Sequence, residues 1–478
     1  MSPSAPARVA CAAPSFVTQA ATRTLQDWLA YFDPAAVLLT GDEPAPRAAS
    51  RLRRHLDADI RLFRPASATG NSDPDHLAGV QVVVAPTTAT LERLHEYEED
   101  QLNPDTPTFV FSDLLALDVD TTTLTTTLVG REEYLTALDP DRLDGTYIHI
   151  ATRLPAEYRR EWAGLTVVGG GQEAGVGGTP LVALDCRNDG RVLTRSLTRS
   201  QLGLRALDRV GETRAERLRE AGFVTRTDVA TAPPNALADL SGIGRKTAER
   251  IRQSARAIAD ETIVRTSNEP LPAGDPVYID IETDGLNPTI TWLIGVLDGT
   301  ADNGTYMAFL QRDPDAPGRA IADFMAWYTA NASHRPLVAY RGWDFDFAVI
   351  HDHIVEYCPD YADDWTNTYR FDPYRWAIEK DNAILPGRTN TLEDVVSALG
   401  YDRADTGLTG AAVARVYQRW MADQSQTNEP DWDRFRTYCE DDVRGLAVLY
   451  EALADSDRLA TTTDRRTDTT TQGSLSDW

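Results

Sequence analysis

The stretch Val277-Tyr-Ile-Asp-Ile-Glu-Thr283 decides the fold of the C-terminal part of this chain. Its apolar and β-branched residues predict a β-strand, and alternation along a strand puts Asp280 and Glu282 on one face, two residues apart. Two neighbouring carboxylates repel each other and are costly beside a core unless a cation compensates them. The stretch therefore favours a pair of divalent cations and a phosphodiester nuclease centre.

Two later segments carry further carboxylates. Arg341-Gly-Trp-Asp-Phe-Asp346 follows an apolar run, which predicts a strand end and a helix start. Tyr438-Cys-Glu-Asp-Asp442 precedes apolar residues at helical spacing, so Tyr438 and Asp442, four apart, share one helix face. This shared face favours Asp442 over Asp441, although both registers stay open, as does the choice between Asp344 and Asp346.

In this order, the three segments resemble the ribonuclease H-like exonucleases called DEDD, in their tyrosine subtype with a Y-x3-D motif. The G-x-x-F-D pattern of residues 342–346 and the Y-x3-D-V pattern of residues 438–443 are most similar to the YprB-like branch. The resemblance covers about residues 274–455 and favours Asp346, which stands in the F-D position. It implies an α/β fold with a mixed sheet and 3′-5′ exonuclease activity.

The resemblance also implies a role for each candidate catalytic residue. Asp280 would bridge two divalent cations, Mg or Mn, while Glu282 and Asp442 would ligate one cation and Asp346 would hold the other, directly or through water. Tyr438 would orient the attacking water. Hard cations of this kind prefer carboxylate oxygens, and two of them can stabilise both the attacking and the leaving oxygen of a phosphodiester.

A second motif lies upstream, in Leu240-Ser-Gly-Ile-Gly-Arg-Lys-Thr-Ala-Glu-Arg-Ile251. It resembles the hairpin of a helix-hairpin-helix module, whose glycine turn and following helix start present backbone N–H groups to a phosphate. Gly242 and Gly244 would permit close approach, and Arg245 and Lys246 would add positive charge. The alternative is a plain helical bundle with capping glycines.

An earlier segment, Val210 to Leu218, looks like a first copy of this hairpin about 31 residues before it, with Thr213 where the second glycine would stand. Gly211 and Arg214 are its candidate contacts with nucleic acid. Because Glu212 would lie near a phosphate, we expect this copy mainly to pack against the second and to make weaker contacts.

The N-terminal part alternates short β-branched runs, such as Val80 to Val84 and Tyr147 to Ile150, with amphipathic stretches such as Thr87 to Glu99. This alternation predicts a parallel α/β sheet. The glycine-rich stretch at 169–178 lacks the patterns of phosphate-binding loops and favours a connector. Leu181 to Leu193 contains Asn-Asp-Gly between two strand-like runs and predicts a β-hairpin.

The predicted domain organisation has six parts. They are a disordered N-terminus at 1–15, an α/β domain of unknown role at 16–198, a tandem helix-hairpin-helix module at 199–262, a linker at 263–276, a ribonuclease H-like exonuclease domain at 277–456 and a disordered tail at 457–478.

Composition bounds the setting in which the protein works. The 478 residues carry a formal net charge of -26, and Lys246 and Lys380 are the only lysines, a balance typical of halophilic archaea and their salty cytoplasm. The segment 191–256 departs from this trend with 14 Arg and Lys against 7 Asp and Glu, which marks a nucleic-acid surface. The four cysteines show no metal-ligand spacing, and no stretch is apolar enough to span a membrane, so a cytoplasmic location is expected.

These observations together predict a metal-dependent nuclease that acts in repair or nucleic-acid processing. The expected partner is nucleic acid, with DNA favoured and with single-stranded or junction ends as substrate, and no membrane. The alternative is a nucleic-acid-binding scaffold that keeps the nuclease fold but cleaves weakly or not at all. Protein partners and the role of residues 16–198 are unknown from the sequence.

Overall fold

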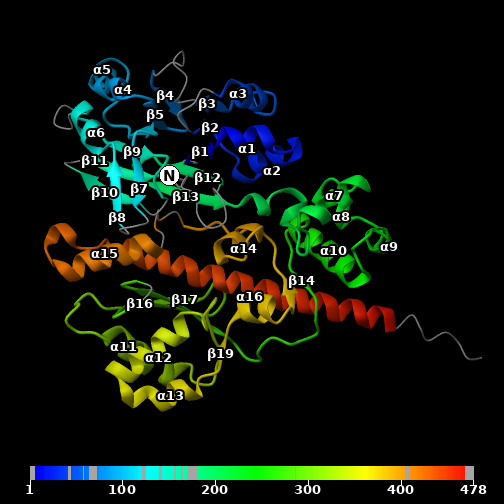
Figure 1. Ribbon diagram of the computed structural model, residues 1–478. Helices are drawn as coiled ribbons and strands as arrows, with labels where there is room; N and C mark the ends of the chain where they lie inside the picture. The colour runs from blue at the N-terminus through cyan, green and yellow to red at the C-terminus, as the bar shows by residue number, and fades with distance from the viewer. Residues whose placement is uncertain are drawn as a thin grey trace, which may run out of the picture. The chain divides into compact units, whose positions relative to one another are not determined.

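The computed structural model describes residues 6–468 except for 41–44, 58, 64–72, 121–124, 139–142, 156–157, 163–164, 171–180, 286, 405, 407 and 409. The chain divides into two compact units, Met1–Gly203 and Leu204–Trp478. Figure 1 shows the elements of both units along the chain. No helix in the described ranges is long and apolar enough to cross a membrane.

The first unit contains two mixed sheets. One has the strand order β13-β12-β1-β2-β3 and the other β10-β11-β9-β6-β5-β4. Strands β7 (Ala116–Asp120) and β8 (Thr125–Val129) pair with each other in a separate hairpin. The strands of the two sheets are β1 (Ala7–Ala12), β2 (Ala36–Leu39), β3 (Arg61–Phe63), β4 (Asp75–Leu77), β5 (Val80–Val84), β6 (Thr108–Ser112), β9 (Tyr147–Ala151), β10 (Arg159–Trp162), β11 (Leu165–Gly169), β12 (Leu181–Cys186) and β13 (Val192–Leu197).

The expected parallel pairing holds at the centre of these sheets and fails at their edges. Strands β5, β6, β9 and β11 are parallel, as are β1, β2 and β3, while β4, β10 and β12 join antiparallel. The predicted hairpin forms, since β12 and β13 pair antiparallel around Asn188 to Gly190. The predicted connector at 169–178 lies largely outside the described residues.

Helices cover the outer faces of the two sheets. Alternate residues of β1 show the arrangement, because Val9 and Cys11 pack toward the second sheet whereas Ala10 and Ala12 pack against helices. These helices are α1 (Pro14–Gln19), α2 (Thr22–Phe32) and α3 (Pro46–Leu52) on the first sheet, and α4 (Thr88–Glu92), α5 (Leu94–Asp100) and α6 (Arg131–Ala137) on the second. The first unit thus has helix, sheet, sheet and helix layers.

The expectation that residues 1–15 are disordered is wrong for the segment Ala7–Ala12. This segment is β1, a central strand paired with both β12 and β2. Its small apolar side chains suit a strand that is buried on both faces, a pattern without the alternation that marks a half-exposed strand.

The second unit begins with a helical module. The 3-10 turn Arg199–Gln201 ends the first unit, and a second turn, Gly203–Ala206, leads into α7 (Glu212–Glu220), α8 (Arg226–Ala230), α9 (Pro234–Ala238) and α10 (Arg245–Ala259). Leu207, Leu218, Ile243 and Ile251 pack in its core. Strand β14 (Val264–Arg265) then pairs with β20 (Ala383–Ile384).

The rest of the second unit is built on a five-stranded mixed sheet with the order β17-β16-β15-β18-β19. The central strand β15 (Val277–Thr283) pairs antiparallel with β16 (Thr291–Asp298) and parallel with β18 (Leu337–Val338), and β17 (Thr305–Leu310) and β19 (Arg370–Phe371) form the edges. The mixed sheet predicted for this region is therefore confirmed.

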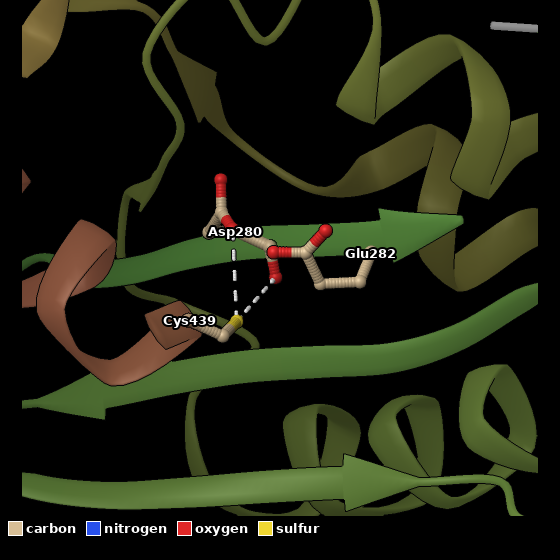
Figure 2. Close-up of side chains that lie close together, drawn as sticks. All are labelled: Asp280, Glu282 and Cys439. Carbon is tan, nitrogen blue, oxygen red and sulfur yellow. Dashed lines mark hydrogen bonds between the residues drawn. The ribbon is translucent and has the colours of Figure 1, made fainter. Parts of the chain in front are cut away.

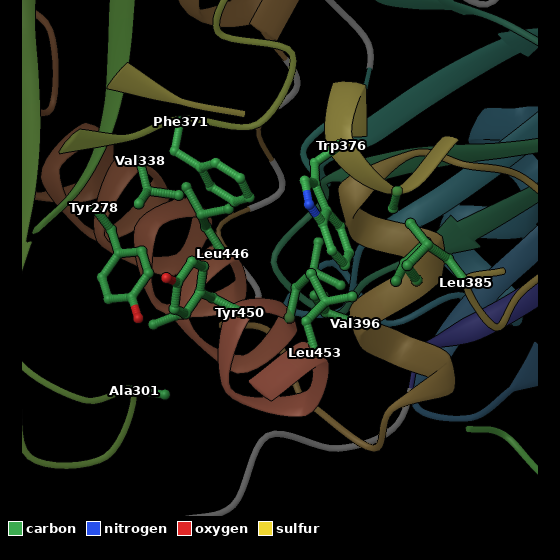
Figure 3. Packing of buried hydrophobic residues seen from close by; sticks show 14 of the residues in the cluster. Tyr278, Ala301, Val338, Phe371, Trp376, Leu385, Val396, Leu446, Tyr450 and Leu453 are labelled. Carbon is green, nitrogen blue, oxygen red and sulfur yellow. The ribbon is translucent and has the colours of Figure 1, made fainter. Parts of the chain in front are cut away.

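Helices cover both faces of this sheet. Val277, Ile279 and Ile281 pack against α11 (Arg319–Asn331), α12 (Asp346–Tyr357) and α13 (Ala362–Asn367). On the other face, Tyr278 meets Tyr450 of the long helix α16 (Trp432–Asp468), as Figure 3 shows. Val396 of α14 (Leu392–Ala398) belongs to the same buried cluster. Helix α15 (Gly410–Ala422) packs near the start of α16 around Trp292. Because α16 continues to Asp468, it extends beyond the predicted domain end at residue 456.

Candidate active site and nucleic-acid interface

Strand β15 presents Asp280 and Glu282 on the face that α16 covers. Their neighbours Ile279 and Ile281 point into the opposite core, as the period of two along a strand requires. Figure 2 shows both carboxylates next to Cys439 of α16. One ligand atom from each of these three residues lies within 4.8 Å of the others.

Asp346 enters the same centre from the first turn of α12. Its side chain is buried, and its charge is close enough to raise the pKa of both Asp280 and Glu282. Asp344 instead has a side chain that is 54% exposed and lies 4.0 Å from Arg341. The structure therefore brings Asp346, and not Asp344, to the carboxylates of β15.

The turn that carries Asp346 is held by a residue that the sequence analysis missed. The buried carboxylate of Asp372, just after β19, accepts hydrogen bonds from the backbone N–H groups of Arg341 (3.0 Å) and Trp343 (3.4 Å). Gly342 lies between these two residues, where a Cβ would clash with the ring of Phe347. An aspartate directly after a short strand, as in Phe371-Asp372, was the available signal.

Helix α16 supplies Tyr438 and Asp442. Burial raises the pKa of Asp280, Glu282 and Tyr438, and the charge of Asp442 adds to the rise at each of them, as expected for a neighbouring carboxylate. Asp441 is occupied elsewhere, because it accepts hydrogen bonds from the Tyr401 hydroxyl (2.9 Å) and the Ala404 N–H (3.0 Å). The five predicted catalytic residues thus lie together, and Asp441 has a structural set of partners.

Burial and mutual repulsion dominate the electrostatics of this centre. Burial, followed by the charge of Asp442, raises the pKa of Asp280 and of Glu282 well above their usual range. Burial likewise raises the pKa of Asp346 to about 7, partly offset by backbone N–H groups. Such a centre holds protons at neutral pH unless cations replace them.

Cys439 and Gly295 allow α16 to approach β15 closely. The Cys439 thiol lies 3.7 Å from the carbonyl oxygen and 3.6 Å from Oδ2 of Asp280, and burial raises its pKa so that it stays protonated and donates (Figure 2). Gly295 stands opposite Asp280 on β16, and a Cβ there would clash with the Cys439 sulfur. A glycine inside a strand is a known sign of such an approach, so the sequence held a signal at Gly295, although it did not identify the partner.

Arg403 is a second residue that the sequence analysis missed. Its guanidinium donates to Asp441 Oδ2 (2.8 Å) and to Asp442 Oδ1 (2.5 Å), and its side chain is 21% exposed. Burial raises the pKa of Asp442 to about 6, and the positive charge of Arg403 opposes that rise. Arg403 thereby compensates one carboxylate of the centre and leaves the others without a paired arginine among the described residues.

The donor set fits hard divalent cations. Four carboxylates converge, and burial, followed by the charge of neighbouring carboxylates, raises their pKa values. Mg and Mn prefer such oxygen ligands to a thiol, so Cys439 does not fit as a ligand to them. Asp280, Glu282, Asp346 and Asp442 are the residues that would hold the cations.

The second hairpin exposes the start of α10. Gly242 has a φ of 76°, a left-handed conformation that favours glycine, and Gly244 is the N-cap of α10. Ile243 between them is buried in the helical core, whereas both glycines, Arg245 and Lys246 are exposed. The first N–H groups of α10 have no partner within the helix, so the hairpin offers backbone donors to an anion.

The first hairpin repeats this geometry with an offset of 33 residues, which corrects the expected 31. Gly211 is the N-cap of α7 as Gly244 is of α10, and Arg209, with a φ of 63°, takes the place of Gly242. Thr213 is therefore not the counterpart of the second glycine, because Gly211 already fills that position. The matching apolar pairs, Leu207 with Leu240 and Val210 with Ile243, were visible in the sequence.

Arg214 and Arg217 of α7 contact the second hairpin. Arg217 donates to the carbonyl oxygen of Ser241 (2.7 Å), and Arg214 donates to that of Gly242 (3.4 Å) and to that of Arg209 (2.7 Å). The guanidinium of Arg214, predicted to contact nucleic acid, is thus placed against backbone carbonyls of both hairpins. These hydrogen bonds hold the backbone carbonyl groups of Ser241 and Gly242 in the second hairpin loop.

Comparisons with known proteins agree with this architecture. Residues 277–454 match the RNase H superfamily, and residues 202–257 match the SAM-like helix-hairpin-helix tandem. A stretch of 61 residues is 46% identical to the DNA repair and recombination protein RadA of Methanoculleus marisnigri. That stretch is 13% of this chain and 19% of the relative, so the likeness covers about a fifth of RadA. The chain therefore contains an RNase H superfamily domain at residues 277–454, preceded by a tandem helix-hairpin-helix module at residues 202–257.

Proposed function

We propose that this protein is a divalent-metal-dependent nuclease, a 3′-5′ exonuclease that hydrolyses DNA in repair or nucleic-acid processing. The observation that carries the proposal is the cluster of Asp280, Glu282, Asp346 and Asp442 around Tyr438, in which four carboxylates share one partly buried centre. An RNase H superfamily domain beside a helix-hairpin-helix tandem supports nucleic acid as the partner.

Each catalytic residue has a proposed task. When bound, two Mg or Mn ions would supply positive charge to the attacking and leaving oxygens of the phosphodiester. Asp280 and Glu282, fixed on the central strand, would hold them together with Asp346 and Asp442. The raised pKa of Tyr438 keeps its hydroxyl protonated, so the phenol would hold and orient a water molecule as a neutral hydrogen-bonding group.

The helix-hairpin-helix module would hold the DNA backbone while the carboxylate centre processes a strand end. A backbone N–H array at a helix start is geometrically fixed and needs few ordered cationic side chains. If the acidic composition reflects a salt-rich cytoplasm, such directional contacts must replace much of the counterion-release contribution, which shrinks in concentrated salt. A shallow salt dependence of DNA affinity would support this view, and a steep one would contradict it.

The activity is tested with end-labelled DNA and RNA, single- and double-stranded, in concentrated KCl with Mn. Stepwise loss of nucleotides from the 3′ end, visible with a 5′ label, is expected for the parent protein. The Asp280→Ala variant should bind the same oligonucleotides without shortening them. Release from the 5′ end or internal cuts would replace the exonuclease assignment with another nuclease mode.

A second candidate function is a nucleic-acid-binding scaffold with weak or no cleavage. The pairing of Arg403 with Asp442 favours it, because a built-in cation already neutralises one of the proposed metal ligands. Binding without any cleavage by both the parent and the Asp280→Ala variant, with Mn present, would establish this candidate.

A further inference from the structure

Trp343 is an exposed tryptophan three residues before Asp346. Large hydrophobic side chains in the described part of the chain are almost all covered, and Trp343 is the only tryptophan among the exposed ones, at 41%. One edge of its indole is anchored, since the ring packs edge-on against the buried ring of Phe347 with centroids 5.3 Å apart. The rest of the indole is partly exposed, on the turn that leads into Asp346 of the carboxylate centre.

Arginines gather around this indole. The Cζ atoms of Arg370 and Arg375 lie 5.0 Å and 5.7 Å from the centroid of the Trp343 ring, and that of Arg341 lies 3.9 Å from the centroid of Tyr374. We call Trp343, Arg341, Arg370, Tyr374 and Arg375 the Trp343 patch. In a chain with a net charge of -26, three arginines on aromatic rings form a local cationic site.

Arg370 lacks a counter-charge. Its Nε is buried with no hydrogen-bond partner, and no carboxylate in the described ranges pairs with its guanidinium. Its guanidinium lies near both Trp343 and Trp365, and burial lowers its pKa. The other two arginines have only long ion pairs, 4.0 Å from Arg341 to Asp344 and 3.5 Å from Arg375 to Glu379. The patch is therefore cationic and incompletely compensated, which suits a phosphate group.

One buried carboxylate fixes the patch relative to the active centre. Besides the N–H groups of Arg341 and Trp343, Asp372 accepts those of Tyr374 (2.9 Å) and Arg375 (3.2 Å). The two loops of the patch follow the parallel strands β18 and β19. Asp372 thus holds both loops as well as the turn into Asp346.

We propose that the Trp343 patch binds the unpaired DNA strand next to the carboxylate centre, with the indole stacked on a base and the arginines on phosphates. This inference rests on the proposed nuclease function and specifies its substrate as a single-stranded end. A base offers a stacking face only after it leaves the duplex, whereas the arginines need only backbone phosphates. The combination therefore selects an unpaired strand over a duplex.

The test measures binding, separately from cleavage. The full-length protein, kept in chelator so that no strand is cut, is titrated against a dye-labelled single-stranded DNA and the matching duplex, with fluorescence anisotropy as readout. Trp343→Ala should weaken single-strand binding about 5- to 150-fold, the range for loss of one stacked base. Trp343→Phe should restore most of the affinity, and duplex binding should change much less.

Control variants separate the patch from general charge and surface effects. Arg375→Gln should also weaken single-strand binding, whereas Arg319→Gln removes an exposed arginine on α11 that pairs with Asp323, and should bind like the parent. Val355→Ala removes an exposed apolar side chain on α12 and should be equally neutral. Thermal melting verifies that each variant is folded.

Unchanged single-strand affinity in Trp343→Ala and Arg375→Gln, or no single-strand binding by the parent, would overturn the proposal. An equal loss on single strand and duplex would do the same, because it would assign the patch to backbone contact alone. Failure of the nuclease proposal is recognised separately, as absence of cleavage with Mn while the binding differences persist.

Discussion

The carboxylate centre gathers partly buried like charges, whereas the second hairpin exposes backbone amides at the start of a helix. The centre is electrostatically unfavourable until cations or protons compensate it, since burial and the neighbouring carboxylates raise the pKa of Asp280 and Glu282. The hairpin is complete without a ligand, because Ile243 anchors it in the core and Arg217 holds the Ser241 carbonyl. This difference predicts that side-chain charge controls cleavage at the carboxylate centre, whereas access to backbone N–H groups controls DNA binding at the second hairpin.

The largest effect is expected for Asp280→Asn. Loss of one charged ligand should remove about 4 kcal/mol of transition-state stabilisation, or about a thousandfold in cleavage rate, while DNA affinity stays near that of the parent. Rates of 3′-end shortening with Mn and affinities in chelator measure the two quantities. Asp344→Asn is the matched control, because that side chain is exposed and should leave cleavage within about threefold of the parent. Equal losses of cleavage rate in both variants would show that the buried Asp280 matters no more to cleavage than the exposed Asp344.

The pH dependence of stability should come next. Because the folded-state pKa of Asp346 is about 7, above its unfolded value of about 4, its stabilising contribution is present below pH 4 and is lost as pH rises through 7. The metal-free protein should therefore lose a few kcal/mol of unfolding free energy between pH 5 and 8 relative to Asp346→Asn. Mn should restore the loss mainly at pH 8, where it no longer competes with protons.

Calorimetry of the parent and the Asp346→Asn variant, with and without Mn, checks this prediction. The variant serves as the reference because the acidic surface also titrates, and that contribution cancels in the difference. A difference that is flat from pH 5 to 8 would contradict a raised pKa of Asp346 in the folded protein.

Gly295→Ala should destabilise the protein by about 2 kcal/mol, a cost typical of overpacking, because the new methyl group meets the Cys439 sulfur. The shift of α16 should lower cleavage more than the loss of stability explains. Gly445→Ala on the same helix is the control. Its Cβ would meet Val396 and Tyr401 at ordinary contact distances, so it should be neutral or stabilising. Urea unfolding measures the free energy of unfolding of both variants. Equal values would show that α16 adjusts to the new methyl group without a loss of stability.

The smallest effect is expected on duplex binding, where the two hairpins should differ. Gly244→Ala keeps an allowed backbone conformation and meets no atom within 4 Å, so the protein should fold normally. The added methyl group would enter the space in front of the amides and weaken duplex binding about tenfold, the cost of one lost charge-assisted hydrogen bond. Gly211→Ala should weaken it less, because Glu212 stands where the second hairpin has Arg245. Equal losses would mean that both hairpins contact the phosphates alike.

Local spacing carried most of the prediction for the active centre. Alternation along residues 277–283 determined that Asp280 and Glu282 share a face, and the spacing of four put Tyr438 and Asp442 on one side of a helix. Local spacing could not show which distant residues Arg403, Asp372 and Cys439 contact, because these contacts join residues 31 to 159 positions apart. It also misjudged the N-terminus, where β1 depends on pairing with β12, more than 160 residues later.

The sequence by itself determined the residue types and the periodicities: carboxylates at a strand period of two, a tyrosine and a carboxylate at a helix period of four, and a repeated glycine hairpin. Tertiary structure settled the two choices that the sequence left open, since Asp346 is buried at the centre whereas Asp344 is exposed, and Asp441 is bound by Tyr401 and Ala404. It also decided the repeat offset of 33, through the left-handed residues Arg209 and Gly242. The physical reason is that periodicity fixes a side chain's direction within its own element, whereas burial and charge compensation arise only when distant elements meet.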